Sequence, residues 1–208
     1  MYYNEDGTEV TQVRQVNETN ASQTQVYTPD GDYSAAFVSS LACVLSHLVS
    51  LPSQGEEKYT RFHAVKVPAI SILDYLRRLQ KYFACSAECF VLSLVYIDRI
   101  IKDHPDFVVS QYNVHRLVVT AVMLAAKFFD DLYYSNAYYA KVGGVKTSEL
   151  NLLEVTFLKM VDWHLFVTLE EFEQYKSHVL MAVAGPTVAS PSQSATSSLR
   201  MEQPEEGD

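Results

Sequence analysis

The amino-acid sequence predicts an all-α protein, and three observations support that fold class. Apolar residues recur at intervals of three and four along most of residues 37–183, which is the spacing of a helix face. Residues 117–126 are apolar on nearly all sides, as expected for a helix buried at the centre of a domain. No alternating apolar and polar run bounded by turn residues indicates a β-strand. We therefore predict one extra N-terminal helix, followed by a group of five around the buried central helix.

Prolines and a capping residue define the first three predicted helices. The first spans residues 37–51, and a proline follows it. Pro68 fits the first turn of the second helix, which extends to about residue 83. Ser86 fits the N-cap of the third helix, which extends to about Lys102.

The central helix is predicted over residues 113–130. The tyrosine-rich stretch 133–139 is predicted to be a connection, and Gly143-Gly144 is predicted to be a turn. Thr147 fits the cap of the fifth helix, whose apolar spacing continues to Val161.

The end of the last predicted helix is also the end of the predicted domain, residues 37–183. Thr168 and Glu171 match a capping box that opens this helix. The polar, acidic segments 1–36 and 184–208 have too few apolar residues to offset their chain entropy, so we predict that both are disordered. They carry −8 of the formal net charge of −9, which leaves the domain nearly neutral.

Composition narrows the class of protein and its location. An acidic chain with a pI of about 5.1 lacks the clustered basic residues that nucleic-acid binding needs. Residues 1–26 are too polar for a signal peptide, and the longest apolar run is far shorter than the ~20 residues of a membrane span. Three cysteines provide no disulfide framework. We expect an intracellular protein of the nucleus, the cytoplasm or both, with no nucleic-acid or membrane partner.

Residues with catalytic or metal-binding potential occur without the partners that they would need. Cys85 and Cys89 could share a helix face, but structural zinc takes four ligands, and no Cys or His pair elsewhere has ligand spacing. We interpret both as small core residues. Asp130 and Asp131 are paired carboxylates at a helix end, with no pocket implied around them. Because no nucleophile, phosphate-loop or metalloprotease motif is present, we expect no enzyme activity, no cofactor and no metal.

Two charged residues stand alone in apolar surroundings. Lys127 is the only charged residue from Leu117 to Phe129, and Glu154 is a single acid within residues 152–155. Taken alone, Lys127 is a cation at a helix C-terminus, which is worth up to about 1 kcal/mol. Taken alone, Glu154 is a solvated acid.

Several runs of this sequence share the pattern of one known family. Residues 118–131, residues 96–99 and residues 150–165 resemble the central helix, the second-helix motif and the fourth helix of the cyclin box. A closer resemblance, to P-type cyclins and plant U-type cyclins, rests on Pro68 and on residues 70–75, 113–116 and 133–144. Together the matches cover about residues 37–183.

The resemblance implies a single five-helix cyclin fold preceded by an extra helix. It also implies a heterodimer with a cyclin-dependent Ser/Thr protein kinase, in cell-cycle or nutrient- and phosphate-linked control. A cyclin has no catalytic site and activates the kinase by binding its active arrangement more tightly. It packs against a mobile kinase helix, whose glutamate then pairs with the lysine of the ATP site.

The resemblance also assigns residues to the kinase-binding surface. By position, Lys127 and Glu154 match two polar residues that bond backbone groups of the kinase helix. The apolar residues that match the surface around them are Leu124, Phe128, Leu158, Trp163 and Leu165. Asp131, one turn beyond Lys127, is predicted to pair with a kinase arginine and to replace part of activation-loop phosphorylation. The alternative for Asp131 is a helix-end acid in solvent.

Two departures from the family pattern affect these expectations. Many cyclins carry a first-helix arginine that pairs with the acid of the second-helix motif, and here residues 67–69 are Val-Pro-Ala. Asp98 therefore needs another partner or faces solvent, and we interpret Asp98 and Arg99 as structural. Cyclins that dock Arg-x-Leu substrates have a tryptophan where this chain has Tyr75, so substrate docking through this altered first-helix patch is in doubt.

Two alternatives to a kinase regulator follow from the sequence. The first is a cyclin-fold scaffold or adaptor that does not activate a kinase. The second is a helical enzyme, which would need a pocket with perturbed acids that the sequence does not indicate.

Overall fold

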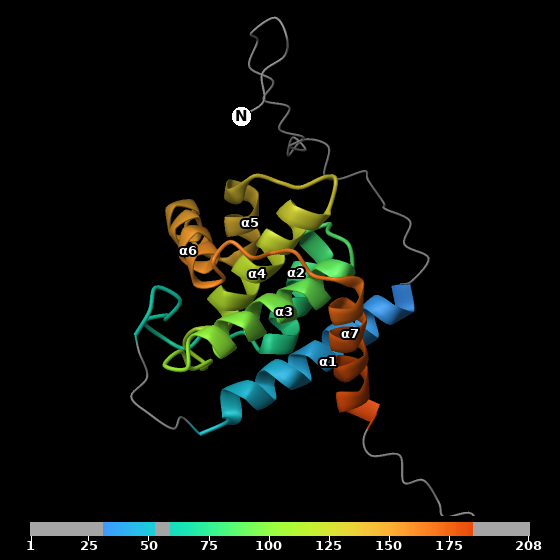
Figure 1. Cartoon of the computed structure of the whole chain (residues 1–208). Helices are drawn as coiled ribbons and strands as arrows, with labels where there is room; N and C mark the ends of the chain where they lie inside the picture. Colours follow the sequence, from blue (N-terminus) through green and yellow to red (C-terminus); the bar gives the residue numbers. More distant parts are fainter. Residues whose placement is uncertain (1–30, 53–58, 185–208) are drawn as a thin grey trace, which may run out of the picture.

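The structure describes residues 31–52 and 59–184, which contain seven α-helices and no β-strand (Figure 1). The structure is a computed structural model. In chain order the helices are α1 (Gly31–Ser50), α2 (Ile72–Tyr82), α3 (Glu88–Asp103), α4 (Val114–Phe129), α5 (Asn136–Gly143), α6 (Thr147–Met160) and α7 (Leu169–Ala184). The predicted all-α class is confirmed. None of the described helices has the length and apolar content to cross a membrane.

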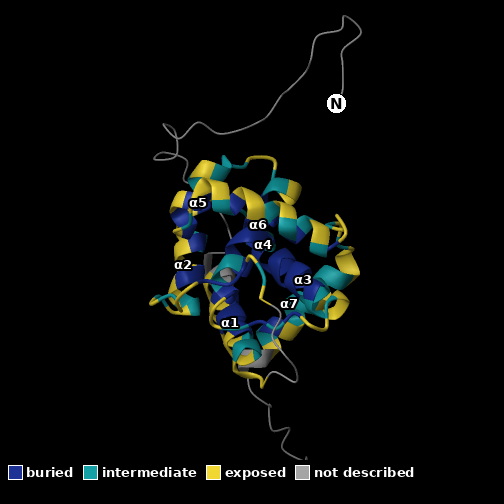
Figure 2. Ribbon diagram, turned by 90° about the vertical axis from the view of Figure 1, so that its left-hand side faces the viewer, coloured by how far each residue is buried: buried dark blue, intermediate teal, exposed yellow. Residues whose placement is uncertain are grey.

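Helix α4 lies at the centre of the fold, as the sequence predicts. It packs against α2, α3, α5 and α6, and every side chain from Leu117 to Ala126 is buried (Figure 2). The one hydroxyl in this stretch, Thr120 Oγ1, donates to the Arg116 carbonyl oxygen at 2.7 Å, so its burial leaves no hydrogen bond unmade. The small side chains of Ala121 and Ala125 let the neighbouring helices approach closely.

Helices α1 and α7 form the side of the molecule away from α5 and α6 (Figure 1). Helix α1 packs against α2 and α7, and it begins at Gly31, six residues before the predicted start. Residues 31–36, which we predicted to be disordered, therefore belong to a helix. Ala35 and Ala36 favour helix, and Phe37 anchors the next turn in the core at 1% exposure. The rest of the two segments predicted to be disordered, apart from Ala184, lies outside the described residues.

The starts of α2 and α6 also differ from the predictions. Ser71 caps α2, with its Oγ accepting from the Asp74 N–H at 3.0 Å, so Pro68 lies in the preceding loop and not in the first turn. Local hydrogen bonding by a serine outweighs the weaker preference of proline for a first turn. Thr147 is the first residue of α6, and Lys146 takes the cap position without a side-chain bond.

A helix that the sequence did not predict, α5, begins within the stretch predicted to be a connection, residues 133–139, and continues to Gly143. Helix α5 is eight residues long, which is too short to show a periodic apolar stripe. Ser135 caps it by accepting from the Tyr138 N–H at 3.3 Å. Rings within the stretch contact one another, with Tyr134 and Tyr138 stacked at 4.3 Å between centroids. The tyrosines that obscured the helix in the sequence therefore hold it in place.

Gly143 and Gly144 end α5 for two different reasons. Gly144 adopts a left-handed φ of 71°, which a glycine takes without strain. Gly143 packs closely against α4, where an added Cβ would lie 2.7 Å from Val119 Cγ2. Its carbonyl oxygen also accepts from the Tyr75 hydroxyl at 2.9 Å, which fastens α2 to the end of α5.

The contact at Gly143 gives the first testable prediction. Gly143→Ala should lower the free energy of unfolding by about 1–3 kcal/mol, because the new methyl overpacks the junction of α4 and α5. Urea unfolding followed by circular dichroism measures the loss. Gly144→Asn is the matched control, since an added Cβ there has nothing within 4 Å and asparagine tolerates a left-handed φ, and it should lower the free energy of unfolding by no more than about 1 kcal/mol. Equal losses in the two variants would contradict the close-packing argument.

Candidate functional site

Helix α4 ends, α5 begins and α6 passes at one place on the surface, where three polar side chains join them. Lys127 Nζ donates to Glu154 Oε1 at 2.6 Å and to Asn136 Oδ1 at 3.2 Å. Asn136 Nδ2 donates to Glu154 Oε2 at 2.7 Å and to Asn151 Oδ1 at 2.8 Å. The fold thus brings together the two isolated charges of the sequence. It adds Asn136, which the sequence analysis did not single out.

This polar cluster of Lys127, Asn136 and Glu154 retains bonding capacity for a further ligand. The Lys127 and Glu154 side chains are only 29% and 15% exposed, so their hydrogen bonds are stronger than bonds in open solvent. An ammonium group has three donors, and a carboxylate has about four acceptor sites. Contacts among the described residues use two of those donors and one site on each carboxylate oxygen. The cluster can therefore both donate to and accept from a peptide backbone.

Exposed apolar side chains occur along the elements that carry the polar cluster. At the end of α4, along α6 and in the segment that leads into α7, they are Phe128, Phe129, Leu132, Leu152, Val155, Trp163, Phe166 and Leu169. Of the five apolar residues singled out by the resemblance, Phe128 and Trp163 are 54% and 64% exposed. Leu158 and Leu165 are partly buried, and Leu124 is buried beneath them in the core. Of these five residues, only Phe128 and Trp163 expose more than half of their surface, where a ligand could contact it.

A groove extends this apolar surface between α3, the end of α4 and the start of α7. Its volume is about 430 Å³. Its apolar lining is made by Leu92, Tyr96, Phe128, Phe129, Leu165, Phe166, Val167, Leu169 and Phe172. An apolar groove beside partly buried charges has the composition of a protein-binding surface.

Trp163 is held outward by an unusual backbone turn after α6. Asp162 and Trp163 have φ values of 47° and 60°, in the left-handed region that non-glycine residues seldom adopt. The Trp163 N–H donates to the Leu158 carbonyl oxygen at 2.8 Å, which closes the helix end. Such strain costs about 1–3 kcal/mol per residue and persists where the surrounding structure enforces it.

Arg99 of α3 holds the segment after this strained turn in place. Its guanidinium donates to the carbonyl oxygens of His164 and Phe166 at 2.7 and 2.9 Å, and it pairs with Glu171 at 2.9 Å. Tyr96, one turn earlier, donates to the Leu165 carbonyl oxygen at 3.0 Å. Residues 96–99 therefore fix the segment after α6, as expected from their structural interpretation. The capping-box prediction is half right, because the Glu171 N–H donates to Thr168 Oγ1 while the carboxylate bonds Arg99.

Asp98 bonds two residues in place of the first-helix arginine that this chain lacks. Lys102 lies 2.6 Å from its carboxylate, and the Tyr175 hydroxyl of α7 donates to it. Burial and this carboxylate raise the pKa of Tyr175. Asp98 thus ties α3 to α7.

The two adjacent acids at the end of α4 have different surroundings. Asp131 is exposed. Asp130 turns inward, where its carboxylate accepts from Ser86 N and Oγ at 3.0 and 2.6 Å and from Cys89 Sγ at 3.3 Å. Ser86 is therefore not the N-cap that we predicted, because its side chain bonds Asp130 and Ala87 takes the cap position.

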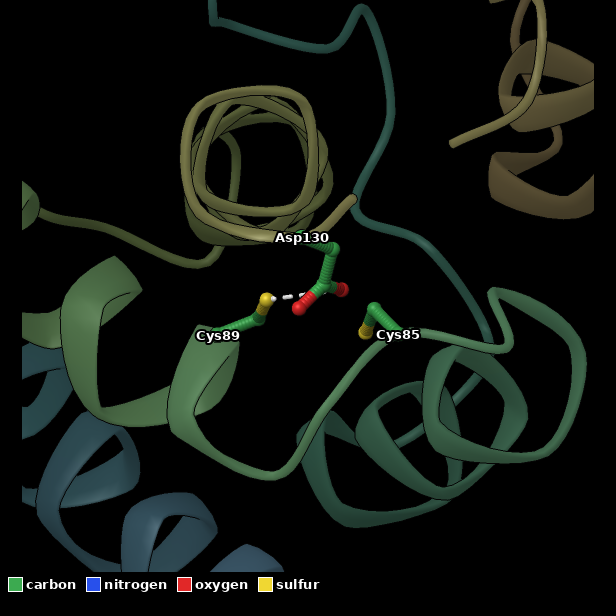
Figure 3. A group of neighbouring side chains, drawn as sticks. All are labelled: Cys85, Cys89 and Asp130. Carbon is green, nitrogen blue, oxygen red and sulfur yellow. Dashed lines mark hydrogen bonds between the residues drawn. The ribbon is translucent and has the colours of Figure 1, made fainter. Parts of the chain in front are cut away.

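Asp130 and two cysteines form the one group of three potential metal ligands in the described part of the chain. The ligand atoms of Cys85, Cys89 and Asp130 all lie within 4.8 Å of one another (Figure 3). The neighbouring Cys85 thiol, burial and the Asp130 charge raise the pKa of Cys89. Cys89 and Asp130 are 41 residues apart in the sequence, and no spacing rule for metal ligands links positions so distant. The sequence alone therefore provided no reason to group the cysteines with the acids.

Tyr75 does not form an exposed patch. Its side chain is 5% exposed, its hydroxyl is bonded to Gly143, and burial raises its pKa. Any substrate docking at the start of α2 would have to use other residues.

Comparison with known proteins relates this geometry to a family. Residues 4–165 match the family model described as Cyclin. The chain is 48% identical over 123 residues to Cyclin-U4-1 of Arabidopsis thaliana. The matched region covers 59% of this chain and 61% of that protein. The chain is also 48% identical over 118 residues to Cyclin-U1-1 of the same organism, covering 57% of this chain and 56% of that protein. It is 43% identical over 123 residues to Cyclin-P4-1 of Oryza sativa subsp. japonica, covering 58% of each. The chain thus spans about three fifths of the length of these curated relatives.

The role of Asn136 in the polar cluster can be tested by mutation. Asn136→Ala removes its hydrogen bonds to Lys127 and Glu154, and it should lower the free energy of unfolding by about 1–2 kcal/mol. Chemical denaturation measures this loss. Asn151→Ala, at an exposed position whose side chain bonds only Asn136 and neither of the two charges, should cost less than about 0.5 kcal/mol. A loss in Asn136→Ala no larger than in this control would show that the cluster is not an energetic unit.

Proposed function

This chain belongs to the cyclin family, and from that premise we propose that it binds and activates a cyclin-dependent Ser/Thr protein kinase as its regulatory subunit. The observation that carries the proposal is the polar cluster of Lys127, Asn136 and Glu154, which is partly buried beside the exposed apolar residues Phe128 and Phe129 at the end of α4. A chain that exposes Phe128, Phe129, Trp163, Phe166 and Leu169 together has a surface suited to a protein partner.

The polar cluster suits the backbone of a helix from the partner. Lys127 has a donor for a peptide carbonyl, and Glu154 has acceptor sites for a peptide N–H. Asn136 fixes the separation of the two charges by bonding both of them. Charge-assisted hydrogen bonds of this kind are about twice as strong as neutral ones. The cluster would therefore set the register of the kinase helix, while the apolar surface supplies most of the binding energy.

Activation follows when this surface fits only one arrangement of the kinase helix. In the active arrangement a glutamate of that helix pairs with the lysine of the ATP site. A shift from 1% to 99% active kinase requires preferential binding of about 5.5 kcal/mol. Complete burial of an apolar side chain is worth about 1.5–3 kcal/mol, and the exposed residues at this site begin about half exposed. Five or six of them, contacted in the active arrangement alone, could supply that preference.

The decisive experiment is capture of kinase activity with the full chain and a charge-swapped variant. The double variant Lys127→Glu/Glu154→Lys keeps an ion pair, so the fold is retained, but it reverses the donor and the acceptor offered to the partner. We expect the unmodified chain to bind one cyclin-dependent kinase and raise its activity. The swapped chain should bind at least about 100-fold more weakly, because each buried charge is then left facing the wrong partner group.

Asp74→Arg/Arg77→Asp is the control, since it swaps an exposed ion pair on α2, a helix that carries none of the residues of this site. It should bind the kinase normally. Equal binding by both swapped chains would show that the interface lies elsewhere. Binding without any rise in kinase activity would favour a scaffold or adaptor.

Asp131 gives a separate prediction about activation. It is exposed at the edge of the site, and we propose that it pairs with a kinase arginine that otherwise binds a phosphorylated activation loop. Asp131→Arg should lower the activity of the unphosphorylated complex by about tenfold, in line with replacing an attraction by a repulsion. Asp103→Arg, an exposed acid at the far end of α3, is the control and should have no effect. Unchanged activity in the Asp131 variant would make this residue an ordinary solvated acid.

A further inference from the structure

Three potential ligands meet where the connection between α2 and α3 touches the end of α4. Cys85 lies in that connection, Cys89 in the first turn of α3, and Asp130 directly after α4. We propose that Cys85, Cys89 and Asp130 form a site for a zinc ion. This inference concerns the isolated chain and does not depend on the proposed kinase partner.

The geometry of the three side chains is close to that of a zinc site. Zinc–sulfur bonds of about 2.3 Å and zinc–oxygen bonds of about 2.1 Å place tetrahedral ligand atoms roughly 3.5–3.8 Å apart. The ligand atoms here lie within 4.8 Å of one another, and Cys89 Sγ is 3.3 Å from Asp130 Oδ2. The thiols of Cys85 and Cys89 lie on either side of the Asp130 carboxylate (Figure 3). Rotation of the three side chains that moves their ligand atoms by up to about 1 Å would place all three on one ion.

The backbone holds Cys85 in the orientation that this site needs. Ala84, the residue before it, has a left-handed φ of 49°, which is unusual for a residue with a side chain. This turn ends the segment after α2 and directs Cys85 toward Asp130 (Figure 3). The Cys-x₃-Cys spacing lies within the range found in zinc sites.

The chemistry of the group favours a soft divalent cation. Thiolate ligands select zinc over magnesium and calcium, which prefer oxygen. Within the described part of the chain, the hydrogen bonds to Asp130 come from the neutral donors of Ser86 and Cys89. Two thiolates and a carboxylate would carry three negative charges, and the divalent ion offsets two of them. Both thiol protons leave to solvent on binding, so affinity should fall as the pH falls.

Ser86 completes the site from outside the ligand set. Its hydroxyl donates to Asp130 Oδ1 at 2.6 Å and its backbone N–H donates to Oδ2 at 3.0 Å. Oδ2 has a second acceptor site, which now takes the Cys89 thiol and would bind the ion once that thiol loses its proton. Hydrogen bonds of this kind orient a ligating carboxylate, and their loss typically lowers metal affinity about 10–100-fold. Because Cys85 is only partly buried, solvent has access to the site, and water would fill the fourth position.

The test titrates the reduced, metal-free full chain with Co²⁺, which reports thiolate ligation by its visible and near-ultraviolet absorption. We expect one Co²⁺ per chain, thiolate-to-cobalt absorption, and displacement of the cobalt by Zn²⁺. Zn²⁺ should also raise the melting temperature of the chain, since it binds the folded state.

Variants identify the ligands. Cys85→Ser, at a position that is only partly buried, should lower the thiolate absorption per bound cobalt, because Cys89 is then the only thiolate of the site, and should bind at least about 100-fold more weakly, beyond the range for an indirect contact. Ser86→Ala should bind about 10–100-fold more weakly with the absorption retained. Cys43→Ser removes the exposed cysteine of α1 and should change nothing.

Three results would overturn the proposal. One is a folded, fully reduced chain that shows no thiolate-to-cobalt absorption. Another is uptake that Cys85→Ser retains in full, because other residues would then hold the ion. The third is absorption lost in Cys43→Ser, which would place the ion between chains or at another site. Circular dichroism of each variant confirms that the helices have formed.

Discussion

Burial of the middle of α4 is the constraint on which the rest of this structure depends. Because its side chains are buried from Leu117 to Ala126, helices must cover that stretch on every side, and the two exposed residues of α4, Phe128 and Phe129, lie in its last turn. Lys127 is the first residue beyond the buried stretch. The depth of α4 in the core therefore decides which residues form the polar cluster, and α5 and α6 bring Asn136 and Glu154 to the same place.

Sequence periodicity was sufficient for the helices that bury a stripe and insufficient for the helix that does not. The central helix and α6 have long apolar repeats, and the sequence predicts both. Helix α5 has eight residues, and its position depends on Ser135, on stacked tyrosines and on the Gly143 contact with Val119. The Gly143 contact is tertiary, and eight residues are too few to show a periodic apolar stripe, so periodicity did not predict the helix, and Asn136 on its first turn was missed with it.

The resemblance to the cyclin box assigned Lys127 and Glu154 to one surface, whereas their isolation among apolar residues, taken alone, favoured a helix-end cation and a solvated acid. Residue type could not separate Asp130 from Asp131, which are identical neighbours with opposite surroundings. Asp130 turns toward the start of α3, where it accepts from the backbone and side chain of Ser86, while Asp131 faces solvent. The chain that receives Asp130 is more than 40 residues away in sequence. Only the packing of α3 against α4 determines which of the two acids turns inward.

The surface beside α4 is fixed from both sides before any partner arrives. On one side, Asp130 holds the end of α4 to the start of α3. On the other, Arg99 and Tyr96 of the same α3 fasten the segment after α6, including the strained turn that exposes Trp163. A preformed surface loses little conformational entropy on binding, so more of its contact energy is available to the complex. That energy can then act on the conformation of the partner, which requires the regulator to be the rigid member of the pair.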